Sequence, residues 1–134
     1  MLAISDINYL SVLIATVASF AFGALWYSPL LFLKKWCRET GINPNESIDN
    51  PGKVYGLTFA LTLISSLVIA VLIQDTPTLV NGLFTGLILG VGIAASSISI
   101  NYQFANRGRV LLAIDAGFHV VRLTIIGLVQ GLIG

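Results

Sequence analysis

Charged side chains are scarce in this chain, and their scarcity excludes an ordinary soluble domain. Only 10% of the 134 residues are Asp, Glu, Lys or Arg, and 56% are hydrophobic. Soluble domains carry about 25% charged residues. Because little sequence remains outside the apolar stretches, we expect one integral membrane domain over residues 1–134 and no separate soluble domain.

Cysteine and histidine occur once each, as Cys37 and His119. A lone cysteine excludes an internal disulfide, and one Cys with one His cannot build a usual all-protein zinc site. The sequence also lacks a nucleophile motif, a glycine-rich phosphate loop after a strand, and a basic aromatic surface for nucleic acid. We therefore expect no metal, no cofactor and no nucleic-acid partner, and an enzyme with His119 as general base is the least favoured function.

Long apolar stretches are what the chain has instead. Four of them approach or exceed the roughly 20 residues that cross a bilayer, at 7–28, 54–73, 79–101 and 110–133. Short turns join the second to the third and the third to the fourth, so these neighbours should pair antiparallel. The sequence predicts an all-α fold, a four-helix transmembrane bundle with the lipid bilayer around it.

Lysine and arginine are missing from the N-terminal tail, the turn at 74–78 and the C-terminal end. Outside the apolar stretches they occur only in the first and third connections, as Lys34, Lys35, Arg38, Lys53, Arg107 and Arg109. Basic loops stay in the cytoplasm. We therefore expect a multi-pass protein with both termini outside.

The segment after the first stretch is apolar and then basic, LLFLKKWCRET at 30–40. Pro29 would break the preceding helix, so this segment should form a short interfacial helix. Trp26, Tyr27 and Trp36 fit an aromatic belt at the membrane surface. The alternative is that Trp26 and Tyr27 stack on a ligand or gate a path.

Small residues recur every four positions in the third stretch, at Gly82, Gly86 and Gly90. Such spacing lets another helix backbone approach closely, which drives packing in lipid. The same arc of the helix continues to Ser97 and Asn101, which we expect to face the last helix.

The last stretch carries a second small-residue face, which includes Gly127 and Gly131 and lies opposite Asp115. A helix that is charged on one face and small on the other suits lipid on neither. We expect its charged face to meet the glycines of the third stretch and its small face to meet another chain. That predicts a homo-oligomer, most simply a two-fold dimer.

Three ionisable residues, Asp115, His119 and Arg122, lie in the last stretch. At 100° per residue, His119 lies about 40° from Asp115 and Arg122 about 20° away on the other side. All three therefore share one helix face, which we call the polar stripe. Ionisable groups in a membrane are costly and need a partner or a water-filled cavity. The polar stripe is the candidate site, with Ser97 and Asn101 as hydrogen-bonding candidates.

The motif at 23–36, GALWYSPLLFLKKW, resembles a family of small bacterial membrane proteins known as domain of unknown function 1761. The resemblance lies in Gly-x-x-Trp-Tyr-Ser-Pro at the end of the first helix, and in Ile-Asp-Ala-Gly-Phe at 114–118. It implies a four-span protein of a bacterial cytoplasmic membrane, and it implies no activity.

Two functions remain open for the polar stripe. In the first, the chain is a small transporter or channel-like protein, in which Asp115 and His119 pass a proton or bind a cation, or Arg122 holds an anion. In the second, the chain is a structural or assembly subunit, in which the three side chains neutralise one another. A wet stripe favours the first function and a dry, paired stripe favours the second.

Overall fold

The computed structural model describes residues 4–134, and its regular elements are helices, with no strand among the described residues. A short turn of 3-10 helix, η1 (Ile4–Asp6), precedes the longer elements. These are α1 (Tyr9–Trp26), α2 (Leu33–Thr40), α3 (Pro51–Ile73), α4 (Leu79–Leu89), the π-helical segment η2 (Gly90–Ala95), α5 (Ser96–Phe104) and α6 (Arg109–Ile133). The elements α4, η2 and α5 follow one another without a break and form one long helix. The all-α prediction is confirmed.

Four helices are long and apolar enough to cross a membrane: Tyr9–Trp26, Pro51–Ile73, Leu79–Phe104 and Arg109–Ile133. Their outward faces are apolar as well, with Leu61, Phe84 and Ile88 each more than half exposed. Soluble proteins rarely leave apolar surface of this extent uncovered. The chain therefore has the composition and helix lengths of a multi-pass membrane protein.

Helix ends follow local signals in the sequence. The helix α3 begins at Pro51, three positions before the predicted stretch, because proline suits the first helical turn. Asn50 caps this end in the left-handed conformation, and its side chain accepts a hydrogen bond from the Lys53 N–H. The helix α2 ends at Thr40 because Gly41 adopts a φ of 78°.

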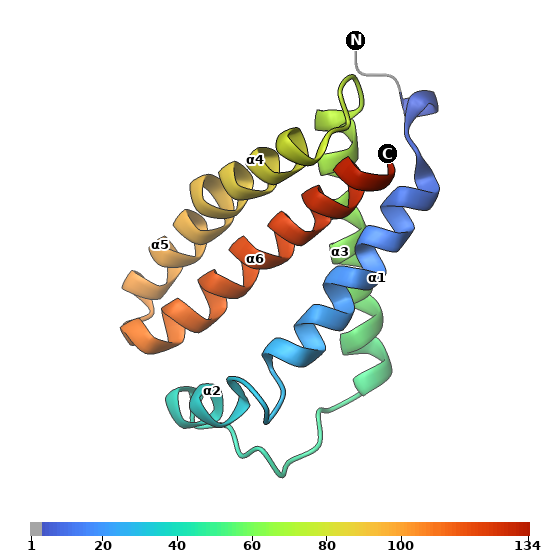
Figure 1. Cartoon of the computed structure of the whole chain (residues 1–134). Coiled ribbons are helices and arrows are strands. Elements are labelled where there is room, and N and C mark those ends of the chain that lie inside the picture. The colour runs from blue at the N-terminus through green and yellow to red at the C-terminus, as the bar shows by residue number, and fades with distance from the viewer. Residues whose placement is uncertain (1–3) are drawn as a thin grey trace.

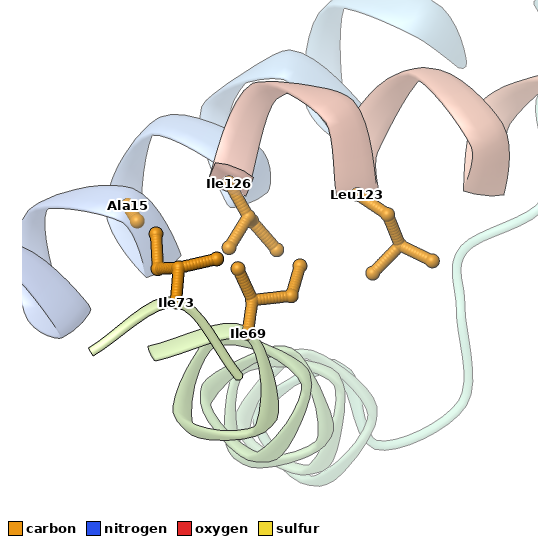
Figure 2. Close-up of a cluster of buried hydrophobic side chains, with 5 residues drawn as sticks. All are labelled: Ala15, Ile69, Ile73, Leu123 and Ile126. Carbon is orange, nitrogen blue, oxygen red and sulfur yellow. The ribbon is translucent and has the colours of Figure 1, made fainter. Parts of the chain in front are cut away.

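The helix α6 lies at the centre of the fold and contacts α1, α3 and α4. Figure 1 shows α6 beside the α4–α5 helix, with the start of α1 and the end of α6 at one end of the molecule and α2 towards the other. Where α1, α3 and α6 meet, Ala15, Ile69, Ile73, Leu123 and Ile126 form a buried cluster (Figure 2). This core holds the face of α6 that carries the candidate site against its neighbours.

The glycines of α4 pack against the small-residue face of α6, within one chain. A Cβ atom on Gly82 would lie 1.9 Å from the carbonyl oxygen of Gly127, and one on Gly86 would lie 2.5 Å from that of Leu123. Likewise, Gly90 lies against Val120, and Gly131 against the Thr78 carbonyl.

The expectation that the charged face of α6 meets the α4 glycines is therefore wrong. The two small-residue faces meet each other instead, because only they allow backbones to come this close. The small-residue face of α6 therefore gives no argument for a dimer, since Gly127 and Gly131 are already buried within one chain. The oligomeric state stays a prediction without that support.

Candidate functional site

Asp115 is bonded by three aromatic side chains from three different parts of the chain. Its Oδ1 accepts from the Tyr27 hydroxyl at 2.7 Å and from the Trp36 indole N–H at 3.1 Å. Its Oδ2 accepts from the Tyr102 hydroxyl. Tyr27 directly follows α1, Trp36 lies on α2 and Tyr102 lies on α5. The carboxyl group thus ties three separate parts of the chain to α6. We call Asp115, Tyr27, Trp36 and Tyr102 the Asp115 node.

The turn between α1 and α2 brings the aromatic donors into place. The Phe32 N–H donates back to the Trp26 carbonyl at 3.1 Å, so the chain folds over before α2 begins. The Trp26 indole N–H donates to the Ile114 carbonyl at 3.1 Å. Phe118 then packs among these rings, with its centroid 5.2 Å from that of Tyr27. The aromatic residues predicted for a membrane belt also make directed contacts with α6.

His119 and Arg122 form a separate pair one turn further along α6. The Arg122 Nε–H donates to His119 Nδ1 at 2.8 Å, and Nη2 donates to the Ser65 hydroxyl of α3 at 3.3 Å. The remaining guanidinium nitrogen, Nη1, is buried and has no hydrogen-bond partner among the described residues. Both side chains are half-buried.

The polar stripe is therefore divided into two sites with different chemistry. Asp115 accepts from neutral aromatic donors and makes no hydrogen bond with His119. Within residues 4–134, Arg122 has no carboxylate partner at ion-pair distance, and its recorded acceptors, His119 and Ser65, are neutral groups. The self-neutralising ladder of Asp115, His119 and Arg122 is not what the side chains form.

Ser97 and Asn101, expected beside Asp115, lie on exposed positions of α5, and Tyr102 takes their place. The reason is the π-helical segment Gly90–Ala95. A π-helical turn holds an extra residue, so the helix beyond it is rotated by about 100° relative to a continuous α-helix. The helix face that begins at the α4 glycines therefore includes Tyr102 and does not include Asn101. The side-chain pattern of 90–95 does not predict this shift.

Sequence reasoning missed a second buried polar group near the other end of α6. Gln130 is 2% exposed, and its side-chain N–H₂ donates to both the carbonyl and the hydroxyl of Ser66 at 2.7 Å. The Ser66 hydroxyl donates to the Val12 carbonyl at 2.9 Å. These bonds join α1, α3 and α6. A glutamine in an apolar stretch is the signal that would have found this contact.

Two hollows on the described surface lie away from both sites. One, of about 260 Å³, is a wholly apolar groove on α3, lined by residues such as Ile64 and Val68. The other, of about 30 Å³, lies beside Gln130, Asn8 and Asp6. Neither is lined by Asp115, His119 or Arg122.

Comparison with known proteins gives a family and no activity. A family model described as "Protein of unknown function (DUF1761)" matches residues 10–131, nearly the whole chain. The match covers both sites described above. No curated protein and no solved structure matches the chain.

Proposed function

Because the chain belongs to the DUF1761 family, whose description names no activity, we propose a function from the site alone: a small membrane transporter that binds an anion at Arg122. The observation that supports this is a half-buried arginine with an unpartnered Nη1 and no carboxylate partner. The fold around it consists of four helices suited to cross a bilayer.

The position of Arg122 makes its lack of a counter-charge costly. It lies near the middle of α6 (Arg109–Ile133), and so near the bilayer centre if α6 crosses the membrane. An arginine at that depth costs about 2.5 kcal/mol or more, and such residues pair with another charge or face a path for substrate. Since Arg122 has neutral partners only, we propose that an anion supplies the missing charge, and Nη1 must become exposed to receive it because that atom is buried.

The guanidinium group is arranged to receive such a ligand. Its Nε–H and Nη2 hydrogen bonds to His119 and Ser65 hold the plane of the group in one orientation. Nη1 remains as the free donor. A hydrogen bond from a charged guanidinium nitrogen to an anionic oxygen is strong, so Nη1 suits a small oxyanion. Asp115 does not compete for this donor, because its oxygens accept hydrogen bonds from Tyr27, Trp36 and Tyr102.

We propose that the protein lies in a bacterial cytoplasmic membrane, as its resemblance to the family implies, with α2 and the 41–50 loop on the cytoplasmic side. The positive-inside rule supports this orientation, since Lys34, Lys35 and Arg38 all lie on α2. The start of α1 and the end of α6 lie at the opposite end of the molecule in Figure 1, which fits an even number of crossings with both termini outside.

Anion flux into liposomes tests the transport function. Purified protein is reconstituted, and uptake of chloride, acetate and inorganic phosphate is compared with uptake by empty liposomes. We expect the wild type to take up at least one of these anions. Arg122→Gln should reduce that uptake to the level of empty liposomes, since it removes the charge and keeps a polar side chain.

Ser97→Ala is the matched control, because Ser97 is exposed on α5 and bonded to neither site. It should transport like the wild type. A folded wild type that moves none of the three anions overturns the proposal for them, and so does an Arg122→Gln variant with full uptake. Monodisperse elution in detergent shows that each variant is folded.

A structural or assembly role is the second candidate, and the Asp115 node favours it. A carboxyl group that ties α2, α5 and the end of α1 to α6 contributes to stability without any solute. In that case, changes at Arg122 and at Asp115 both lower stability and leave anion binding absent. The flux and binding measurements therefore separate the two candidates.

A further inference from the structure

We propose that His119 couples anion binding at Arg122 to the uptake of a proton. This inference rests on the proposed anion site and adds the way in which that site is regulated. It is carried by the contact between the two side chains: His119 Nδ1 accepts the Arg122 Nε–H at 2.8 Å.

That contact defines the protonation state of the imidazole in the empty site. A ring nitrogen that accepts a hydrogen bond carries no proton, so neutral His119 has its proton on Nε2. A second proton can enter only at Nδ1. It would break the bond from Arg122 and place two positive charges side by side, which without an anion is unfavourable.

The surrounding elements offer His119 little other charge. On α6, the carboxyl group of Asp115 lies one turn away and is bonded by Tyr27, Trp36 and Tyr102. The helix α3 contributes the neutral Ser65 beside Arg122. The sequences of α4 and η2 contain no ionisable residue, and α1 contains only Tyr9, at its first position. Arg122 is therefore the charge that chiefly opposes protonation of His119.

A bound anion reverses that opposition. Its negative charge lies against both cations, so it stabilises the protonated imidazole, and by linkage the protonated imidazole strengthens anion binding. Anion affinity should therefore rise as pH falls through the titration range of His119. Movement of a monoanion together with this proton would carry no net charge across the membrane.

Binding of methanesulfonate across pH tests the coupling, because the charge of this strong-acid anion stays constant. Calorimetry on the full chain in nanodiscs is run between about pH 4 and pH 8, a range that extends below the ordinary titration of histidine because the Arg122 charge opposes protonation. We expect the dissociation constant of the wild type to fall by about tenfold towards the acid end, within the usual range of coupling energies. Repeating the titration in buffers of different ionisation enthalpy should show proton uptake on binding.

His119→Gln is the matched variant, because an amide oxygen can still accept from the Arg122 Nε–H but does not titrate. It should bind methanesulfonate with an affinity independent of pH and take up no proton. A wild type that binds with a constant affinity and no proton uptake overturns the coupling and leaves the anion site standing. A His119→Gln variant with the wild-type pH dependence also overturns it. A folded wild type that binds no methanesulfonate at any pH, and moves none of the flux anions, overturns the anion site and the coupling together.

Discussion

Asp115 and Arg122 show how different two charged residues on one helix face can be. Asp115 accepts three hydrogen bonds from aromatic donors, so much of the cost of burying it is offset within the chain. Arg122 donates two bonds to neutral groups and keeps one buried donor unpaired. An unpaired buried donor of a charged group costs more than a missing neutral bond. At the residue scale, Asp115 therefore stabilises the fold, whereas Arg122 is the residue that we propose binds an anion.

Removal of the Tyr102 hydroxyl should destabilise the protein measurably. Tyr102→Phe deletes one of the donors to Asp115, and a hydrogen bond to a charged group contributes about 1.5 to 3 kcal/mol. Because Tyr102 is only partly buried, we expect a loss of about 1 to 2 kcal/mol. Thermal or denaturant unfolding in detergent measures the change.

Tyr55→Phe is the control for this prediction. Tyr55 is 51% exposed and packs edge-on against Phe20, a contact that a phenylalanine keeps. Its stability should match that of the wild type. If Tyr102→Phe is as stable as this control, the hydrogen bond of Tyr102 to Asp115 contributes nothing to the fold.

At the scale of elements, the contact between α4 and α6 is built from glycine. Backbone atoms of the two helices approach so closely that a single methyl group has no room at Gly82, Gly86, Gly127 or Gly131. Such contacts replace the hydrophobic effect, which does not join helices in lipid. They also fix the depth of α6 relative to α4, and so the positions of Asp115 and Arg122 along the molecule.

Gly127→Ala should therefore be strongly destabilising. The added Cβ would lie 2.0 Å from the Gly82 carbonyl oxygen, which is backbone and can move only with its helix. Overpacking of this kind costs about 1 to 3 kcal/mol or more, and we expect about 3 kcal/mol. The measurement is the unfolding midpoint of the purified protein in detergent.

The control is Gly92→Ala in η2, on the long helix that packs against α6, where an added Cβ meets nothing within 4 Å. Alanine also has the higher helix propensity, so this variant should be as stable as the wild type or slightly more stable. Equal loss at both positions would mean that the close approach of α4 to α6 is not what stabilises the pair.

The π-helical segment Gly90–Ala95 is the element that selects Tyr102 for the Asp115 node. Before this segment, the glycines of α4 face α6. After it, the residues that face α6 are shifted by one position along the chain, so that Tyr102 faces Asp115. Segments of this type recur at functional sites. Here the segment lets one long helix make a close backbone contact with α6 at its α4 end and donate a hydroxyl hydrogen bond to Asp115 at its α5 end.

At the scale of the whole molecule, the basic residues of α2 all lie at one end. The helix α2 carries Lys34, Lys35 and Arg38 at the end opposite to the start of α1 and the end of α6 (Figure 1). The proposed orientation in the membrane follows from this placement. It makes the loop at 41–50 cytoplasmic and the turn between α3 and α4 external.

Cysteine labelling in cells tests that orientation. In a Cys37→Ala background, Asn45→Cys and Thr76→Cys each introduce one exposed thiol, in the loop and in the turn respectively. A membrane-impermeant maleimide should label Thr76→Cys in intact cells, and Asn45→Cys only after the membrane is opened. The reverse pattern would invert the proposed orientation.

Much of the molecule follows from short-range patterns in the sequence. Apolar stretch length predicts the four long helices, and Pro51 and Gly41 mark helix ends, because both effects act within a few residues. Asp115, His119 and Arg122 stand out by residue type alone, and the small residues at Gly82, Gly86 and Gly127 indicate close packing.

The choice of partners was decided only by the tertiary structure. The glycines of α4 meet the glycines of α6, and one π-helical turn exchanges Asn101 for Tyr102 beside Asp115. The aromatic residues near α2 reach the same carboxyl group from positions distant in sequence. The physical reason is that residue spacing along the chain determines which side chains share a helix face. Which other helix packs on that face depends on how closely the two backbones can approach. That geometry left Arg122 with neutral partners, the basis of the proposed function.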